Sequence, residues 1–293
     1  MQNATSRTAG HVALFRALES ARRRDKVFDD PYASKFLPPR YRTLARLARI
    51  PAVRRRVERY IDTRFPAGPR ASAVVRTRLI DDLVGEALAA GIEQVLLLGA
   101  GYDSRAYRLP AMASARVFEV DHPATQASKR RRIRAHVRPA QRAHVRFVPV
   151  DLMRDDLSDA LRRAGFATDE RAVVVWEGVT NYLTADAVDT TLRHLAGIIA
   201  SGGRLVVTYI DRSALDGTGG FSGVEEWHAA VRRHGEPWTF GFDPVELPGY
   251  LAERGMRLTH DLSTREAAAR YLGPLGRDEP AAPFYRIACA EFD

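Results

Sequence analysis

The chain has 293 residues, of which 45% are hydrophobic and 28% are charged. These values are typical of an ordinary soluble globular protein, with one large domain or a core and an added subdomain. The single cysteine, Cys289, excludes an internal disulfide and a cysteine metal cluster and suits a reducing compartment. No apolar stretch resembles a signal peptide or approaches the roughly twenty residues that span a bilayer. We therefore expect a cytoplasmic protein with no membrane partner.

The formal net charge of +9 raises the hypothesis of a nucleic-acid partner. Only three of the 45 basic residues are lysines, and heavy use of arginine is typical of a GC-rich coding sequence. The basic runs at residues 22–24, 54–56 and 129–132 are typical of solvated helix faces. No basic strand with interleaved aromatic residues accompanies them. We expect no nucleic-acid partner, and an RNA-associated role rests on net charge alone.

Residues 1–75 carry helical patterns without good strand candidates. Residues 11–20 and 41–60 are the best helix candidates, with breaks at Pro38-Pro39, Pro51, Pro66 and Pro69. Because no sheet precedes it, this segment must pack around the core as a helical cap. Such a cap can exclude water from a site or simply protect a sheet edge.

Residues 76–90 are predicted to form an amphipathic helix, because apolar side chains recur at helical spacing. Gly91 is well placed as the C′ residue of this helix. The apolar run at residues 95–98 then predicts a strand that is buried on both faces of a parallel sheet.

The central motif is a glycine turn that follows this strand directly. In Gly99-Ala100-Gly101 the missing side chains let backbone N–H groups approach a ligand closely. About twenty residues later, a second strand at residues 116–120 ends at Asp121, whose carboxylate can accept both hydroxyls of a ribose. This layout predicts nucleoside binding. The alternative is an ordinary strand–turn–helix connection with an Asp121 that faces solvent.

The details of the turn argue against a dinucleotide. The third glycine of the Gly-x-Gly-x-x-Gly pattern is replaced by Ser104, and Asp103 adds negative charge where a pyrophosphate would lie. A cationic or zwitterionic ligand suits the turn better. S-adenosylmethionine carries a ribose, a sulfonium and an ammonium but no phosphate, so it is favoured over NAD.

Further strands bring acidic residues to the same edge of the sheet. After a helix at residues 124–137, a strand at 145–150 ends at Asp151-Leu152. The Asp151 carboxylate can accept from an adenine amino group and the Leu152 N–H can donate to the ring, although Asp151 can also cap a short helix.

The next strand, residues 172–176, delivers Glu177 to this edge. Thr184 is a candidate N-cap of a helix that runs to about residue 200, and residues 204–210 are a fifth strand. Alternating strands and helices with a ligand turn after the first strand predict a doubly wound parallel sheet.

Residues 211–245 are rich in glycine and aromatic residues, which indicates either a mobile flap that shapes an acceptor pocket or a poorly ordered surface insertion. A helix at residues 248–254, strands at 257–262 and 284–292, and a Gly/Pro-rich loop at 273–283 complete the chain.

Six motifs occur in a fixed order along nearly the whole chain. They are Asp30-Pro31-Tyr32; Arg76-Thr77-Arg78 with Asp81-Asp82; Leu98-Gly99-Ala100-Gly101-Tyr102-Asp103-Ser104-Arg105; Phe118-Glu119-Val120-Asp121; Asp151-Leu152; and Glu177-Gly178-Val179-Thr180-Asn181-Tyr182-Leu183. Together they resemble the leucine carboxyl methyltransferase family, including its bacterial and polyketide-tailoring branch.

The resemblance implies a Rossmann-like, seven-stranded class I methyltransferase sheet with an N-terminal helical cap and an antiparallel end. It implies that Arg76, near the start of its helix, contacts the cofactor carboxylate. It also implies that Glu177 contacts the cofactor through its ammonium group and that Tyr182 lies near the acceptor pocket.

The predicted divisions follow from these elements. They are a cap at residues 1–75, a cofactor-binding core at 76–210, an acceptor flap at 211–245 and closing strands at 246–293. The predicted cofactor site comprises Arg76, Gly99, Ala100, Gly101, Asp121, Asp151, Leu152 and Glu177.

The expected reaction is transfer of a methyl group from S-adenosylmethionine to an oxygen of a small molecule. A carboxylate acceptor is ionised at neutral pH and needs no general base, whereas a phenol, with a pKa of about 10, benefits from one. No base with an orienting partner is evident, so the catalytic residues stay unassigned. Tyr182, His228 and His234 are the candidates, and His122 beside Asp121 is a further histidine near the site.

A carboxylate acceptor is therefore preferred, and a phenolic or enolic polyketide hydroxyl is the alternative. An NAD-linked oxidoreductase and a non-catalytic nucleoside- or RNA-binding protein are hypotheses from other classes. No metal-ligand constellation, nucleophile elbow or P-loop is present in the sequence, and the oligomeric state stays open.

Overall fold

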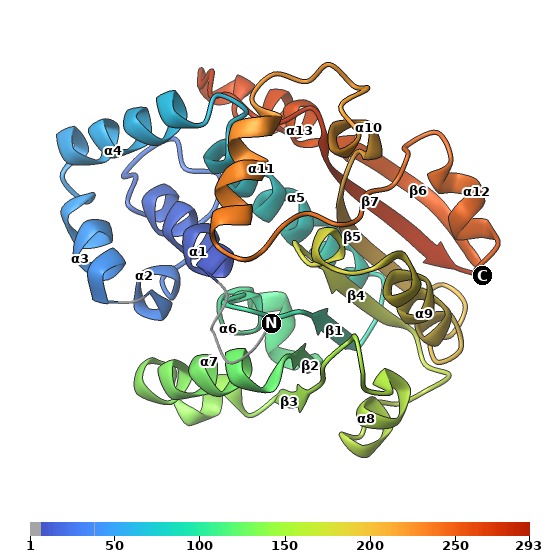
Figure 1. Cartoon of the computed structure of the whole chain (residues 1–293). Helices are drawn as coiled ribbons and strands as arrows, with labels where there is room; N and C mark the ends of the chain where they lie inside the picture. Colours follow the sequence, from blue (N-terminus) through green and yellow to red (C-terminus); the bar gives the residue numbers. More distant parts are fainter. Residues whose placement is uncertain (1–6, 38) are drawn as a thin grey trace.

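The computed structural model describes residues 7–37 and 39–293. A seven-stranded sheet in the order β3-β2-β1-β4-β5-β7-β6 runs through the molecule, with helices on both faces (Figure 1). The predicted Rossmann-like class I sheet is thus confirmed. The strands are β1 (Gln94–Leu98), β2 (Arg116–Asp121), β3 (Val145–Pro149), β4 (Ala172–Trp176), β5 (Arg204–Ile210), β6 (Met256–Ser263) and β7 (Tyr285–Phe292).

The first five strands are parallel, and β7 pairs antiparallel with both β5 and β6. This confirms the antiparallel end that the sequence predicts. Every residue of β1 and β4 is buried, because both strands are central and helices cover both of their faces. In β1, Val95 and Leu97 face one core, whereas Leu96 and Leu98 face the other.

The two cores have different helical covers. One face packs against α1 (Arg7–Ser20), α2 (Ala33–Phe36), α3 (Pro39–Leu47), α5 (Pro69–Ala89), α6 (Arg105–Arg108), α7 (Pro123–His136) and α13 (Thr264–Tyr271), with α4 (Pro51–Arg64) outside them. The other face packs against α8 (Leu157–Arg163), α9 (Ala185–Ala196) and α12 (Leu247–Ala252). Among residues 7–37 and 39–293, no helix combines the length and the apolar character needed to cross a membrane.

The N-terminal helices differ in detail from the sequence prediction. Residues 41–60 form parts of two helices, α3 and α4, which Pro51 separates as expected. The predicted break at Pro38 and the first six residues of the predicted cap lie outside the described residues. Helix α5 begins at Pro69 rather than at residue 76, because proline suits the first turn of a helix. Arg76 therefore lies about two turns inside α5, and its predicted place near the helix start is wrong.

At the other end of α5, Gly91 has φ of +83° and follows the C-cap Ala90, as predicted. Thr184 caps α9 through its hydroxyl, also as predicted, although α9 ends at Ala196. The sequence prediction missed α2 and α13. Helix α13 begins with a capping box, in which the side chains of Ser263 and Glu266 bond to each other's backbone N–H groups.

Ion pairs join the N-terminal helices to the segment after α13. Arg277 donates to both carboxylate oxygens of Glu19 on α1, each at 2.8 Å. Glu279 accepts from Arg70 on α5 at 2.8 Å, and Arg22 bridges Glu58 and Glu279. These contacts hold the helical cap against the core. The predicted loop at residues 273–283 also contains a short 3₁₀ turn, η4 (Gly273–Leu275).

The segment between β5 and α12 contains α10 (Arg212–Leu215) and α11 (Val224–Arg233). Val224, Val231 and Trp238 are buried against Phe284 and Tyr285 of the C-terminal strand region. The segment is therefore packed, and the interpretation as a poorly ordered insertion is wrong. In Figure 1, α11 stands in front of the sheet beside α1.

Candidate active site

The predicted cofactor residues meet at one edge of the sheet. Leu98 pairs with Val120 on one side and with Trp176 on the other, so Gly99, Asp121 and Glu177 follow neighbouring strands. The N–H of Val150 donates to the carbonyl of Asp121 at 3.0 Å, which places Asp151 beside them. The fold thus assembles residues that are up to 78 positions apart in the sequence.

The glycine turn is shaped by its contact with the segment after β4. Gly99 has φ of +63°, and a Cβ atom there would lie 2.2 Å from Cγ2 of Val179. Both the backbone conformation and the space therefore require glycine. Gly101 also has positive φ, at +41°, and lies close to Ala9 of α1.

The N–H groups of the turn are used inside the protein. Gly101 donates to Oδ2 of Asp121 at 2.5 Å, Ala100 donates to the carbonyl of Val120 at 3.0 Å, and Asp103 donates to the carbonyl of Ala100 at 2.7 Å. A phosphate-binding turn instead directs such groups at its ligand. The turn is therefore poorly suited to a pyrophosphate.

The Asp121 carboxylate lies at the centre of this edge. It accepts from the N–H of Gly101 and, at 2.7 Å, from the N–H of His122. Burial raises the pKa of Asp121, although these two hydrogen bonds and nearby Lys129 oppose the effect. Nδ1 of His122 accepts from Ala124 at 3.3 Å and caps α7, so this histidine has a structural role.

Asp151 and Leu152 follow β3 on the outer side of Asp121. The Asp151 carboxylate accepts from the N–H of Met153 at 3.1 Å, which closes a local turn. The interpretation of Asp151 as a helix N-cap is wrong, because α8 begins at Leu157 with Asp156 as its cap. Leu152 is half-buried and packs against the second core.

Arg76 and Glu177, predicted to bind opposite ends of an amino-acid group, form an ion pair. Nε of Arg76 donates to Oε1 of Glu177 at 2.7 Å, and the guanidinium lies 4.8 Å from the ring centre of Tyr285. Arg105 donates to Oε2 of Glu177 at 2.6 Å. Burial alone would raise the pKa of Glu177, but Arg105 and Arg76 lower it to about 2.

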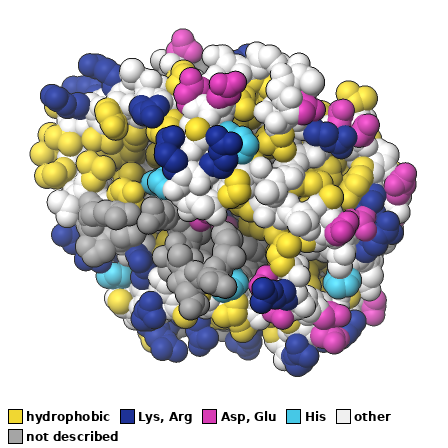
Figure 2. Space-filling model, in the orientation of Figure 1, with side chains coloured by type: hydrophobic (Ala, Val, Ile, Leu, Met, Phe, Trp, Pro, Cys, Tyr) yellow, Lys and Arg dark blue, Asp and Glu magenta, His cyan; other side chains and the backbone are white. Residues whose placement is uncertain are grey.

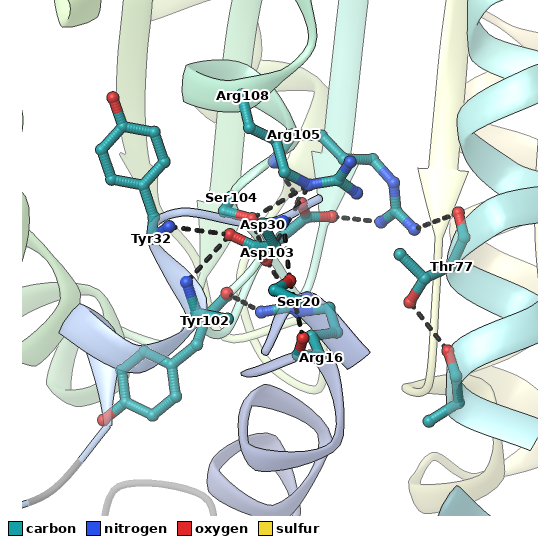
Figure 3. Close-up of polar contacts among 12 residues, drawn as sticks. Arg16, Ser20, Asp30, Tyr32, Thr77, Tyr102, Asp103, Ser104, Arg105 and Arg108 are labelled. Carbon is teal, nitrogen blue, oxygen red and sulfur yellow. Dashed lines mark hydrogen bonds and ion pairs between the residues drawn. The ribbon is translucent and has the colours of Figure 1, made fainter. Parts of the chain in front are cut away.

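These residues belong to a larger set that we call the buried charge network: Arg16, Asp30, Arg76, Asp81, Asp103, Arg105, Arg108 and Glu177. The close-up in Figure 3 shows its centre, where side chains from the N-terminal segment and the glycine turn converge. Its four arginines match its four acids, so the network carries no net charge at neutral pH.

Arg105 is the hub of the buried charge network. Its side chain is fully buried and pairs with Asp81 at 2.8 Å and with Asp103 and Glu177 at 2.6 Å each. Arg108 then pairs with Asp81 at 2.7 Å and approaches Asp30, which accepts from the hydroxyl of Ser104 at 2.6 Å. The network therefore connects the turn to α5, α6 and the loop before α2.

One of these contacts changes the sequence interpretation. Asp103 was predicted to repel a pyrophosphate, but Arg105 neutralises it and holds the pKa of its carboxyl well below the usual range, despite burial. Sequence reasoning also assigned no role to Arg16, Asp30, Asp81, Arg105 or Arg108. Four of these residues lie in or next to the six motifs, so the motifs could have identified them as functional candidates.

Aromatic residues gather around Tyr285, whose ring lies beside the guanidinium of Arg76. Trp227 stacks on Tyr285 with ring centres 5.9 Å apart, and it packs edge-on against Trp238 at 5.5 Å. Tyr182 is half-buried against this cluster, and burial raises its pKa, so it stays protonated at neutral pH.

The two candidate histidines lie on α11 and at its end. His228 stacks on Trp238 at 5.3 Å, and burial lowers its pKa, so its ring is neutral at pH 7. Its Nε2 is buried without a hydrogen-bond partner within residues 7–37 and 39–293. The ring centre of His234 lies 5.3 Å from that of His11. Their part in catalysis stays a prediction.

Comparison with known proteins agrees with this geometry. The model of the leucine carboxyl methyltransferase family matches residues 9–196. A protein of Mycobacterium tuberculosis (strain ATCC 25177 / H37Ra) is 32% identical over 291 residues, covering 94% of this chain and 89% of its own length. A Frankia alni protein is 33% identical over 268 residues, covering 92% and 87%. Both are provisionally named S-adenosyl-L-methionine-dependent methyltransferases.

Solved structures support the fold. A protein from Thermobifida fusca, provisionally named a methyltransferase, superimposes with a TM-score of 0.59 at 18% identity and covers 95% of this chain and 94% of its own. A DUF574 family protein from Streptomyces avermitilis gives 0.58 at 15% identity, covering 95% and 97%. With a family match over more than half its length, the chain belongs to the leucine carboxyl methyltransferase family.

Proposed function

We propose that this protein is an S-adenosylmethionine-dependent O-methyltransferase that methylates a carboxylate of a small molecule, such as a metabolite or natural product. The observation that carries the proposal is the internal use of the turn's N–H groups beside the half-buried Asp121 carboxylate. Such a site can accept hydrogen bonds from ribose hydroxyls, and the N–H groups of Ala100, Gly101 and Asp103 are already used within the protein. This favours an adenosyl group over NAD.

The residues at the edge suit the remaining parts of this cofactor. Asp151 and the N–H of Leu152 would hold the adenine, and Asp121 would hold the ribose. Arg76 and Glu177 form a buried pair of opposite charges, which matches the carboxylate and the ammonium of a zwitterionic amino-acid group. The cofactor supplies a methyl group on a positively charged sulfur that becomes neutral on transfer.

The protein contributes to the reaction by positioning the acceptor and by excluding water. The acceptor oxygen must lie in line with the methyl group and the sulfur, and a dry site strengthens this arrangement. The wall of Trp227, Tyr285 and Tyr182 beside Glu177 supplies an apolar surface on the acceptor side. A carboxylate acceptor arrives ionised, so these residues need not remove a proton.

One observation favours a phenolic or enolic hydroxyl as the second candidate acceptor. The same aromatic wall suits a planar ring, and the neutral ring of His228 has a buried Nε2 that makes no hydrogen bond within the described chain. Such a nitrogen can accept the proton of a phenol. Tyr182 stays protonated and is therefore better suited to orienting an acceptor than to acting as a base.

The cofactor proposal is tested by isothermal titration calorimetry with S-adenosylhomocysteine, NAD and single-stranded RNA. We expect binding of S-adenosylhomocysteine and no response to the other two. Tight NAD binding without a response to S-adenosylhomocysteine would contradict the proposal.

The acceptor is tested with S-adenosylmethionine labelled in the methyl group and a panel of carboxylic acids and phenols. Treatment of the labelled product with mild base separates the two candidates, because methyl esters are hydrolysed readily and aryl ethers are not. Release of volatile label supports the carboxylate, and base-stable label supports the phenol.

A further inference from the structure

A second arginine-rich region lies away from the active site. Residues 122–150 contain eight lysines and arginines and no aspartate or glutamate. Two of the eight are held against other parts of the protein: Lys129 pairs with Glu119 at 2.8 Å, and Arg132 donates to the carbonyl of Phe36 and lies over the ring of Tyr102. Arg146 donates to the nearby carbonyl of Ala143 at 3.3 Å.

The other six are Arg130, Arg131, Arg134, Arg138, Arg142 and Arg146, which we call the basic face. None of them forms an ion pair within the described part of the chain. Figure 2 shows dark blue side chains gathered over α7 and β3 at the lower left of the molecule.

The basic face contains a hollow of about 290 Å³ between α7, the 3₁₀ turn η2 (Pro139–Arg142) and β3. Its charged lining is Arg130, Arg134 and Arg142, and its apolar lining is Ile133, Pro139, Ala143 and Phe147. The guanidinium of Arg130 lies 5.2 Å from the ring centre of Phe147. We call this site the arginine hollow.

The arginine hollow is separate from the candidate active site. Turn η2 comes just before the first residue of β3, whereas Asp151 comes just after its last residue. The hollow therefore lies toward the start of the parallel strands, and the cofactor residues lie at their carboxyl ends. A ligand in one site would not contact the residues of the other.

No carboxylate within the described chain balances the charges of the hollow. Arg130 and Arg134 are four residues apart on α7, a spacing at which like charges destabilise a helix. The helix dipole favours a cation in the last turn, which accounts for Arg134 alone. Arg142 lines the same hollow from η2, so three arginines line it, and no acidic residue does.

We propose that the arginine hollow binds a small phosphate ester. Arg130, Arg134 and Arg142 would hold the phosphate, because guanidinium groups match its oxygens in pairs. Phe147, Ile133 and Pro139 would contact an apolar group attached to it. The volume is near the lower limit of small-molecule sites, which suits one ester group and a ring rather than a large ligand.

The shape favours a small ester over a nucleic acid. Proteins that bind single strands use a groove that follows the backbone together with exposed aromatic rings on which the bases stack. The hollow has one aromatic residue, Phe147, which is only partly exposed and already lies under Arg130. Binding of RNA is therefore kept as an outcome of the test that would contradict the proposal.

The test is isothermal titration calorimetry of the full chain with phenyl phosphate, using phenol and inorganic phosphate as comparison probes. We expect phenyl phosphate to bind more tightly than either probe. Arg134→Gln and Arg142→Gln should each weaken binding by about tenfold or more, since each removes a charge-assisted contact. The matched control is Arg131→Gln, an arginine on the same helix that does not line the hollow.

Three results would overturn the proposal. They are absence of phenyl phosphate binding, equal weakening by Arg131→Gln and Arg134→Gln, and binding only of single-stranded RNA with an affinity that rises with its length. Circular dichroism checks that each variant is folded. Titration with S-adenosylhomocysteine should be unchanged in Arg134→Gln, so this result does not depend on the cofactor proposal.

Discussion

The buried charge network and the basic face are two arginine clusters with opposite environments. In the network, four arginines meet four acids, and nearly every guanidinium is buried against a carboxylate. On the basic face, six arginines meet none within the described chain, and most of them are exposed. The same residue type therefore organises the interior in one place and faces outward in the other.

This difference separates charges that hold the fold from charges that are available to a ligand. Arg105 has all its major partners inside the protein. Asp121, at the same edge, accepts two backbone N–H groups but forms no ion pair in the part of the chain that the structure describes. Asp121 and the arginine hollow thus share one property: their charge is available to a ligand.

The largest predicted effect is that of Arg105→Gln. It leaves the buried Asp103 carboxylate without its ion-pair partner and removes one of the two arginines that pair with Asp81 and with Glu177. Removing one member of a buried pair costs about 3–5 kcal/mol, so we expect a loss of this size in the free energy of unfolding, measured by urea denaturation.

The matched control is Arg116→Gln, which breaks an exposed pair with Glu170. Exposed pairs contribute about 0–1 kcal/mol, so the control should stay close to the native protein. Similar losses in the two variants would show that burial does not distinguish the network from the surface.

Part of the fold and of the candidate site was predictable from the sequence. The strands with continuous apolar runs, β1 and β4, and the turn between β1 and α6 follow from local pattern, because burial on both faces leaves little room for polar residues. The edge that holds Gly99, Asp121, Asp151 and Glu177 follows in turn, since parallel strands end at the same side of a sheet.

The partners of the charges were not predictable in this way. Arg105 and Asp81 are 24 residues apart, and Arg105 and Glu177 are 72 apart. Their contacts depend on how α5 and β4 pack around the turn, which no local periodicity specifies. For this reason the sequence did not predict that Arg105 neutralises Asp103. Helix α13 was not predicted, although its Ser263-x-x-Glu266 capping box is a local signal.

A smaller effect, on binding rather than on folding, is predicted for Asp121→Ala. Loss of the carboxylate leaves ribose hydroxyls without an acceptor and should weaken S-adenosylhomocysteine binding by about 1–3 kcal/mol in calorimetry. The control is Asp159→Ala, a solvent-exposed acid on α8, which should not change affinity. Unchanged affinity in Asp121→Ala would show that Asp121 does not bind the cofactor, and its charge would then not be comparable with that of the arginine hollow.

The contribution of the buried charge network to stability should fall in acid, whereas that of the basic face should not change. The pKa of Glu177 is lowered from 4.5 to about 2, so its ion pairs contribute fully above about pH 4.5 and are lost as the pH falls toward 2. We expect the stability difference between the native protein and Glu177→Gln to narrow over this window in urea denaturation. For Arg142→Gln the difference should stay constant, since arginine does not titrate there. A constant difference for Glu177→Gln would show that its carboxylate is not held by the arginines.

The smallest effect is predicted for Arg131→Gln, where the sign should be opposite to that of Arg105→Gln. Arg131 is exposed and lies three residues before Arg134 on α7, so its removal relieves repulsion between like charges. Such pairs are worth about 0.2–0.5 kcal/mol, and we expect a gain of this size in unfolding free energy at low ionic strength. Because the interaction is between exposed charges, the gain should vanish near 1 M salt, where the screening length is about 3 Å. A loss of stability in Arg131→Gln would mean that this arginine has a partner inside the protein, and the basic face would then be a second charge network rather than a ligand-facing surface.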